Sequence, residues 1–172
     1  MDAKTDRRKF LELIVLGGTA TWLAPAAYAP AARAAGAAEA LLLSCTDFRL
    51  MDEIERYMTA RGLRDRYVHV ALEGASLGVD SDKHPAWSAT FWEQLELAVE
   101  HQRIRRVIVI DHRDCDAYRR ELGDEHLKDV KTERQAHAAE LRKLKDRIRE
   151  KYPEVEVEMK LMQLGGRVEA IT

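Results

Sequence analysis

The chain has 172 residues, of which 46% are hydrophobic and 34% are charged. This length fits one domain, and the composition is that of a globular protein rather than a disordered one. The 28 basic and 30 acidic residues give a formal net charge of −2. Because there is no basic surplus to neutralise phosphates, we expect no nucleic-acid partner.

The first part of the chain has the pattern of an export signal. Arg7 and Arg8 precede a moderately apolar run at residues 13–29, and small residues follow it. A membrane anchor would need about 20 apolar residues without breakers, whereas this run contains glycines and a proline. The pattern predicts a twin-arginine-type signal peptide over residues 1–34 and a mature domain over residues 35–172. We therefore expect a periplasmic or secreted protein that has no membrane contact after the signal is removed.

Strand and helix patterns alternate along the mature chain. Strands are predicted at residues 40–43, 67–72, 107–111, 155–161 and 168–171, and helices at 50–61, 85–102 and 127–152. Residues 73–78 are predicted as a loop, and the charged residues at 128–151 are expected on a solvated helix face. This alternation predicts an α/β fold, a three-layer domain with a mostly parallel central sheet flanked by helices. The first strand is expected between the second and the third.

The two cysteines follow two of these predicted strands. Residues 107–110 form a β-branched run typical of a buried strand, and His112 and Cys115 come directly after it. Cys45 ends the apolar run of the first strand. Because ligands bind outside the carboxyl ends of adjacent parallel strands, and because zinc prefers sulfur and nitrogen donors, the sequence predicts a Zn²⁺ site of Cys45, His112 and Cys115.

Three protein ligands leave a tetrahedral zinc one open position, which is typical of a catalytic site. Water in that position has its pKa lowered to about 7. Asp47 and Arg49 follow Cys45 at alternate positions, where they can form a bidentate pair. Asp47 then either accepts a hydrogen bond from the bound water or replaces it as the fourth ligand, and the sequence leaves both alternatives open.

A disulfide is the competing interpretation of the two cysteines. An oxidising compartment favours a bond between Cys45 and Cys115, and the protein would then be an exported α/β module without enzymatic activity. His69 and His137 fit hydrogen-bonded structural histidines better than functional ones. His69, His84 and His126 are candidates for the residue that removes the proton, and the sequence does not distinguish between them.

The order Cys-x-Asp-x-Arg at residues 45–49 and His-x-x-Cys at residues 112–115 resembles the β-class carbonic anhydrases. The resemblance implies a zinc enzyme that hydrates carbon dioxide reversibly to bicarbonate by metal-bound hydroxide. It also implies catalytic roles for Asp47 and Arg49 and a homodimer or higher homo-oligomer.

Some positions depart from the pattern of that family. Asp116 stands where the family usually has glycine, and residues 71–75 replace its usual Arg-Asn-Ala segment. Two further interpretations therefore stay open. One is a zinc-binding relative without hydration activity, and the other is a hydrolase of carbonyl sulfide or carbon disulfide on the same scaffold.

Overall fold

A five-stranded sheet with the order β2-β1-β3-β4-β5 forms the middle layer of the computed structural model, which describes residues 38–172. The strands are β1 (Ala40–Ser44), β2 (Tyr67–Ala71), β3 (Arg106–His112), β4 (Glu156–Met162) and β5 (Val168–Ala170). The first four are parallel, and β5 pairs antiparallel with β4. The predicted mostly parallel sheet is confirmed, with β1 between β2 and β3. The predicted signal peptide lies outside the described residues.

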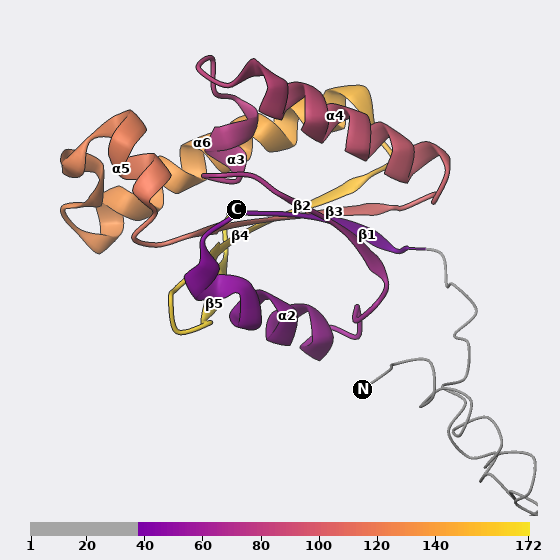
Figure 1. The fold of residues 1–172 in the computed structure, drawn as a ribbon, viewed down its shortest axis with the longest axis horizontal. Helices are drawn as coiled ribbons and strands as arrows, with labels where there is room; N and C mark the ends of the chain where they lie inside the picture. Colours follow the sequence, from indigo (N-terminus) through magenta and orange to yellow (C-terminus); the bar gives the residue numbers. More distant parts are fainter. Residues whose placement is uncertain (1–37) are drawn as a thin grey trace, which may run out of the picture. The chain divides into compact units, whose positions relative to one another are not determined.

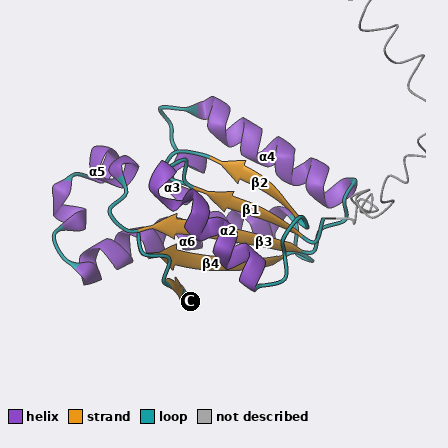
Figure 2. Ribbon diagram, turned by 60° about the horizontal axis from the view of Figure 1, so that its bottom comes forward, coloured by secondary structure: helices purple, strands orange, loops and turns teal. Residues whose placement is uncertain are grey.

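Helices cover both faces of the sheet, which confirms the predicted three-layer α/β class. They are α2 (Met51–Ala60), α3 (Ser76–Val79), α4 (Pro85–Glu100), α5 (Asp116–Leu122) and α6 (Val130–Lys151), with 3₁₀ turns η2 (Phe48–Leu50) and η3 (Asp124–Leu127). Figure 1 shows α3, α4 and α6 on one face and α2 on the other. Helix α5 lies beyond the end of the sheet, as Figure 2 also shows.

The alternation of side chains along the central strands divides the apolar core between these two faces. Leu41 and Leu43 belong to the cluster under α4 and α6, whereas Leu42 belongs to the cluster under α2. Val109 and Ile110 of β3 divide in the same way. Successive side chains of a strand point to opposite faces, and each fully buried aliphatic side chain stabilises the fold by about 1.5–3 kcal/mol. The two central strands are therefore held from both sides.

The structure adds two short helices that the sequence pattern did not predict. Helix α3 lies in the segment predicted as a loop, and α5 lies in the polar stretch after Cys115. A helix of four or seven residues has too few turns to produce a recognisable apolar period. The long predicted helix begins later than expected, at Val130, because the Asp129 side chain accepts hydrogen bonds from the backbone N–H groups of Lys131 and Thr132.

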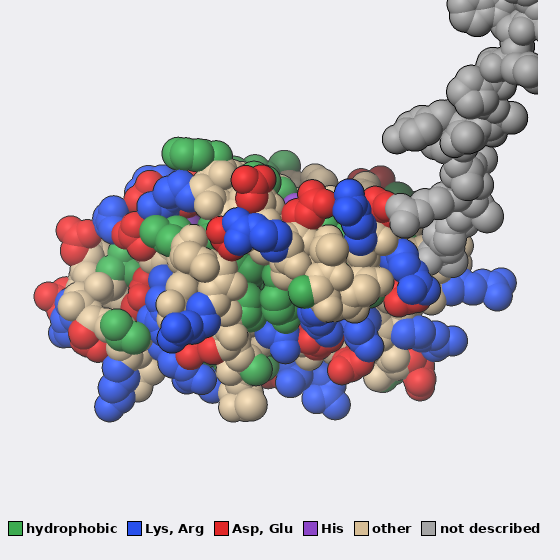
Figure 3. All heavy atoms as spheres, turned by 90° about the horizontal axis from the view of Figure 1, so that it is seen from below, with side chains coloured by type: hydrophobic (Ala, Val, Ile, Leu, Met, Phe, Trp, Pro, Cys, Tyr) green, Lys and Arg blue, Asp and Glu red, His purple; other side chains and the backbone are tan. Residues whose placement is uncertain are grey.

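The surface of the α2 side carries charges of both signs. Figure 3 views this side and shows Lys and Arg side chains interspersed with Asp and Glu side chains. In the described part of the chain, none of the helices combines the length and the apolar character that crossing a bilayer requires.

Candidate metal centre

Cys45, His112 and Cys115 meet at the carboxyl ends of β1 and β3. In the parallel pairing Ser44 lies opposite Ile110, so Cys45 leaves β1 beside the last residues of β3. His112 is the final residue of β3, and Cys115 precedes the first residue of α5. The two sulfurs and a ring nitrogen of His112 all lie within 4.8 Å of one another. All three side chains are buried, and both cysteines are free thiols.

The donor set fits a zinc ion. The Nδ1 atom of His112 lies 2.9 Å from the carbonyl oxygen of Arg113. Because a carbonyl only accepts, Nδ1 is the protonated donor and Nε2 is free to act as a ligand. Nε2 is buried and has no hydrogen-bond partner, which would be costly unless another group completes it. Two thiolates and one imidazole nitrogen are typical zinc ligands.

Backbone N–H groups stabilise both sulfurs. Gly74 donates its N–H to the Sγ of Cys45 at 3.3 Å. The Cys45 sulfur and burial raise the pKa of the Cys115 thiol, and the backbone N–H groups of Ala117 and Tyr118 oppose this shift. Gly74 has a φ of 78°, and a Cβ there would lie 3.0 Å from the Cβ of Ala117. Glycine at this position therefore lets the loop pack closely against α5, where its N–H reaches Cys45.

The ionisation of the ligand cluster is shared between its members. Interaction with the Cys115 side chain lowers the pKa of Cys45 well below its ordinary value, and interaction with the Cys45 side chain raises the pKa of Cys115. Burial disfavours a charged His112, but the neighbouring Cys45 thiolate outweighs this effect and raises the pKa of His112. These shifts favour a thiolate at Cys45, and a dication would displace the remaining protons.

Asp47 and Arg49 form a multidentate pair beside these ligands. The Nε of Arg49 donates to Oδ1 of Asp47 at 3.0 Å, and Nη2 donates to Oδ2 at 2.6 Å. The hydrogen bonds with Arg49 lower the pKa of Asp47 to about 2. The Oδ2 atom of Asp47 lies 3.8 Å from Nε2 of His112. An ionised hydrogen-bond acceptor therefore stands next to the free ligand atom.

A second carboxylate, which the sequence analysis did not select, holds Arg49 from the opposite side. Nη1 of Arg49 donates to Oδ2 of Asp114 at 3.0 Å, and Nη2 donates to the backbone oxygen of Asp114 at 3.0 Å. Asp114 has a φ of 56°, which is uncommon for a residue with a side chain. Arg49 thus connects the turn between His112 and Cys115 to the segment that follows β1.

A buried polar network supports the same end of the sheet. Asp111 is 1% exposed, and its Oδ2 accepts hydrogen bonds from the hydroxyls of Ser76 at 2.6 Å and Tyr118 at 2.7 Å. Nδ1 of His137 lies 3.1 Å from the same oxygen. This network connects β3, α3, α5 and α6. It agrees with the prediction that His137 is a buried, hydrogen-bonded structural residue.

The expectation that the charged residues at 128–151 form only a solvated face is wrong for Glu133. This side chain is buried, and its oxygens accept hydrogen bonds from Arg113 at 2.8 Å and from the backbone N–H of Asp114 at 2.6 Å. The signal in the sequence was available, because Glu133 lies four residues before His137 on the inner side of the helix. Its binding partners, however, are far away in the sequence.

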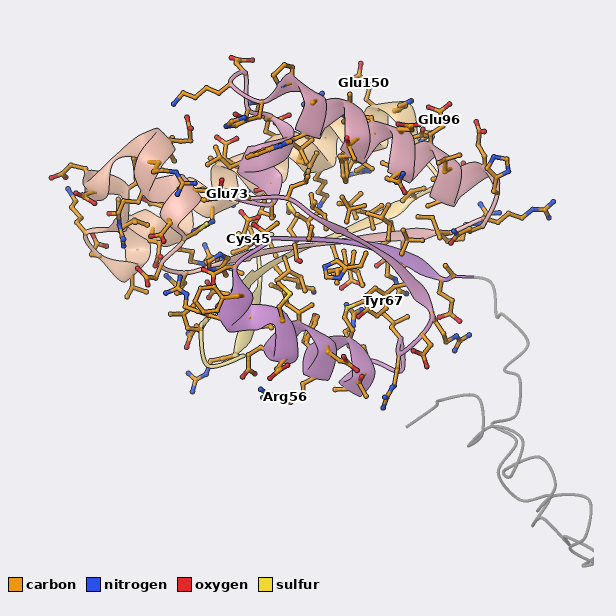
Figure 4. All side chains as sticks on the ribbon, in the orientation of Figure 1. Cys45, Arg56, Tyr67, Glu73, Glu96 and Glu150 are labelled. Carbon is orange, nitrogen blue, oxygen red and sulfur yellow. The ribbon has the colours of Figure 1, made fainter. Side chains whose placement is uncertain are left out.

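A cavity of about 390 Å³ opens beside the cluster. It is lined by Cys45, Thr46, Asp47, Phe48, Arg49, Glu73, Cys115, Asp116, Ala117 and Arg120. Figure 4 shows Cys45 and Glu73 close together at the end of the sheet from which α5 leaves. Glu73 forms an ion pair with Arg120, and Asp116 forms one with Arg119, so the extra acidic charge of Asp116 is partly neutralised.

The three histidines considered as proton shuttles lie outside this lining. Nε2 of His69 is 2.7 Å from the Ser44 hydroxyl, which favours the predicted structural role. His84 stacks on Trp87 with ring centroids 4.0 Å apart, and it lines a smaller neighbouring cavity that shares Glu73 and Arg120 with the first. The proton path stays a prediction.

Two proteins of known sequence are clearly similar to this chain. An uncharacterized protein of Rickettsia conorii is 42% identical over 134 residues, which cover 78% of this chain and 72% of the relative. An uncharacterized protein of Rickettsia bellii is 38% identical over 134 residues, covering 78% and 82%. The chain belongs to the family of these rickettsial proteins. No established family model matches it.

Comparison with solved structures shows which proteins share the fold of this chain. A carbonic anhydrase from Glaciozyma antarctica superposes with a TM-score of 0.51 at 15% identity, covering 96% of this chain and 95% of that chain. One of two tetrameric β-carbonic anhydrases from Sordaria macrospora gives a TM-score of 0.50 at 16% identity, covering 78% and 81%. At this identity the similarity establishes a shared fold.

Replacing Arg49 with glutamine should raise the pKa of Asp47 from about 2 toward its ordinary value of 3.8, because the guanidinium stabilises the carboxylate. The depressed pKa means that the pair stabilises the fold above pH 3.8 and that this contribution is lost as the pH falls through about 2. Carbon-13 NMR titration of the Asp47 carboxyl group measures the shift. A midpoint that stays near 2 in the variant would contradict the assigned pairing.

Proposed function

We propose that this protein is a zinc-dependent carbonic anhydrase that catalyses the reversible hydration of carbon dioxide to bicarbonate. The observation that carries the proposal is the convergence of Cys45, His112 and Cys115 within 4.8 Å on a fold shared with β-carbonic anhydrases. A zinc ion held by these residues supplies a Lewis acid that makes water nucleophilic at neutral pH.

The residues around the ligands have separate tasks in this proposal. Asp47, kept ionised by Arg49, accepts a hydrogen bond from the reacting water and orients it toward the substrate. Asp114 holds Arg49 and so prevents it from leaving Asp47. With Arg49 in this position, both oxygens of Asp47 are engaged by the guanidinium, which favours the open site over the alternative with Asp47 as a metal ligand.

The cavity beside the ligands suits a small neutral substrate. Its apolar side chains include Phe48 and Ala117, and its charged residues are largely arranged in pairs, such as Glu73 with Arg120. A volume of about 390 Å³ admits carbon dioxide with several waters. Carbonyl sulfide and carbon disulfide have a similar shape. The assays described below distinguish which of the three is the substrate.

We expect the purified protein to contain one zinc ion per chain and to hydrate carbon dioxide faster than buffer alone in stopped-flow measurements. Removal of the metal with a chelator should abolish the activity, and Cys45→Ser should prevent zinc binding. Asp47→Asn should keep the zinc and lower turnover by about 10²-fold, because an orienting acceptor is lost. Asp52→Asn, an exposed site on α2, is the control.

Three outcomes separate the alternatives. Stoichiometric zinc without hydration would reject the anhydrase and leave a zinc-binding protein of this fold. Release of sulfide from carbonyl sulfide or carbon disulfide, at a rate above that of carbon dioxide hydration, would identify a hydrolase. Absence of zinc together with loss of both free thiols would favour the disulfide-bonded module.

We also propose that the protein assembles as a homodimer or higher homo-oligomer. Phe48 lines the cavity and is 85% exposed, so a large aromatic ring at the mouth of the site is available for a second copy. We expect a molecular mass above that of one chain in analytical ultracentrifugation and a shift toward monomer in Phe48→Ser. Val130→Ser, at another exposed apolar residue that is 69% exposed, should leave the mass unchanged.

We propose that the protein is exported to the periplasm or beyond by a twin-arginine-type signal. The support is the residue pattern alone, with Arg7 and Arg8 ahead of an apolar run and Ala32-Arg33-Ala34 before the mature domain. Exported protein should begin at Ala35 by N-terminal sequencing. Replacing both arginines with lysine keeps the charge and should block export, and a full-length intracellular chain in the unaltered protein would contradict the proposal.

A further inference from the structure

The turn between His112 and Cys115 is held by a buried carboxylate from a helix that contributes no metal ligand. Glu133 lies in the first turn of α6 and is 7% exposed. Its Oε1 accepts the backbone N–H of Asp114 at 2.6 Å, and its Oε2 accepts a hydrogen bond from Nη1 of Arg113 at 2.8 Å. A buried carboxylate is costly unless it is paired, and here both oxygens are occupied.

The peptide unit that Glu133 binds is also the one that binds His112. The carbonyl of Arg113 and the N–H of Asp114 belong to one planar peptide group. Its oxygen accepts the Nδ1–H of His112 at 2.9 Å, and its N–H donates to Glu133. The carboxylate, the peptide and the imidazole therefore form one chain of hydrogen bonds, with Nε2 of His112 at its far end.

This arrangement polarises the peptide in one direction. A negative charge at the N–H end withdraws the proton and makes the carbonyl oxygen a stronger acceptor, because hydrogen bonds in series strengthen one another. A stronger acceptor at Nδ1–H makes the imidazole a better electron donor at Nε2. Metal-binding histidines commonly obtain this support from a carboxylate or carbonyl in direct contact. Here the peptide unit between Arg113 and Asp114 lies between the carboxylate of Glu133 and the imidazole of His112.

We propose that Glu133 is a positioning residue that tunes His112 as a metal ligand through the peptide unit between Arg113 and Asp114. The inference rests on the metal site of the proposed function and deepens it. Glu133 is neither one of the three candidate ligands nor one of the residues that line the cavity. It acts by fixing the orientation of the imidazole ring, the proton on Nδ1 and the basicity of Nε2.

Glu169 provides a matched control. It lies in β5, and it accepts a hydrogen bond from Nη2 of Arg113 at 3.0 Å, so it neutralises the same guanidinium. No hydrogen bond of Glu169 to the peptide between Arg113 and Asp114 occurs in the part of the chain that the structure describes. Removing the charge of Glu169 tests the loss of an ion pair with Arg113, whereas removing the charge of Glu133 tests the relay as well.

The experiment compares Glu133→Gln with Glu169→Gln. In Glu133 each carboxylate oxygen accepts one of the two hydrogen bonds. A glutamine is uncharged and replaces one of these oxygens by an NH₂ donor, so it cannot keep both bonds in this arrangement. We expect Glu133→Gln to weaken zinc binding by about 10–100-fold in competition with a chelator, the range typical of residues that support a metal ligand. Glu169→Gln should stay within about twofold of the unaltered protein. Equal affinities in the two variants would overturn the proposal.

A second readout separates tuning from a loss of folding. In protein labelled with ¹⁵N-histidine, the proton on Nδ1 of His112 should move upfield in Glu133→Gln and stay in place in Glu169→Gln, with or without metal. Lower thermal stability of the metal-free variant with unchanged zinc affinity and unchanged proton shift would reveal a merely structural role. If Glu133→Gln does not fold, Glu133→Asp keeps the charge but withdraws it from the Asp114 N–H, and it should show the same two changes.

These readouts do not depend on the hydration of carbon dioxide. If the unaltered protein binds zinc but shows no hydration, the proposed activity fails while the affinities still decide the role of Glu133. If the unaltered protein hydrates carbon dioxide and Glu133→Gln binds zinc equally well, the relay fails and the activity stands. If it binds no zinc, the proton shift of His112 alone decides for or against the relay.

Discussion

The register between β1 and β3 is the constraint on which the site depends. Ser44 pairs with Ile110 in a parallel ladder, so both chains leave the sheet at the same end and at nearly the same height. A register slip by one residue would turn the side chains that follow each strand to the opposite face. Since both faces of these strands are packed into apolar cores, such a slip would exchange the side chains that fill the two cores and disrupt the close packing of each. Packing away from the site therefore fixes the separation of the candidate metal ligands.

Charged side chains hold the turn that follows β3. The sheet ends at His112, and the next residues form a turn whose Asp114 adopts a left-handed backbone. Arg49 holds this turn from the β1 side and Glu133 holds it from the α6 side. Each interaction joins segments more than 15 residues apart, and each involves a charged group, which makes the hydrogen bonds stronger than neutral ones. The turn is thus fixed by tertiary contacts, although its own backbone preference opposes its conformation.

Sequence patterns predict the parts of this structure that depend on local periodicity. The strands, the longer helices, the position of β1 and the meeting of two cysteines with His112 follow from apolar runs and from the geometry of parallel sheets. The supporting residues do not follow from them. Asp114 looks like an ordinary surface charge in the sequence, and for Glu133 the helical spacing from His137 indicates the inner side of the helix but no partner. The packing of α6 against the turn at residues 113–114 reveals the partners of both. Asp111 was equally hidden, because its partners come from three separate helices.

The same contacts bear on how the proposed zinc ion would relate to folding. Small zinc domains depend on the ion for folding because they lack a sufficient core, whereas this chain buries apolar clusters on both faces of a five-stranded sheet. The N–H of Gly74 binds the Cys45 sulfur, and the Arg113 carbonyl holds the His112 ring. Because the ligands are positioned by the protein itself, little ordering remains for the ion to induce. In the proposed zinc site, the binding free energy of the ion would then be available for affinity and for the proposed chemistry.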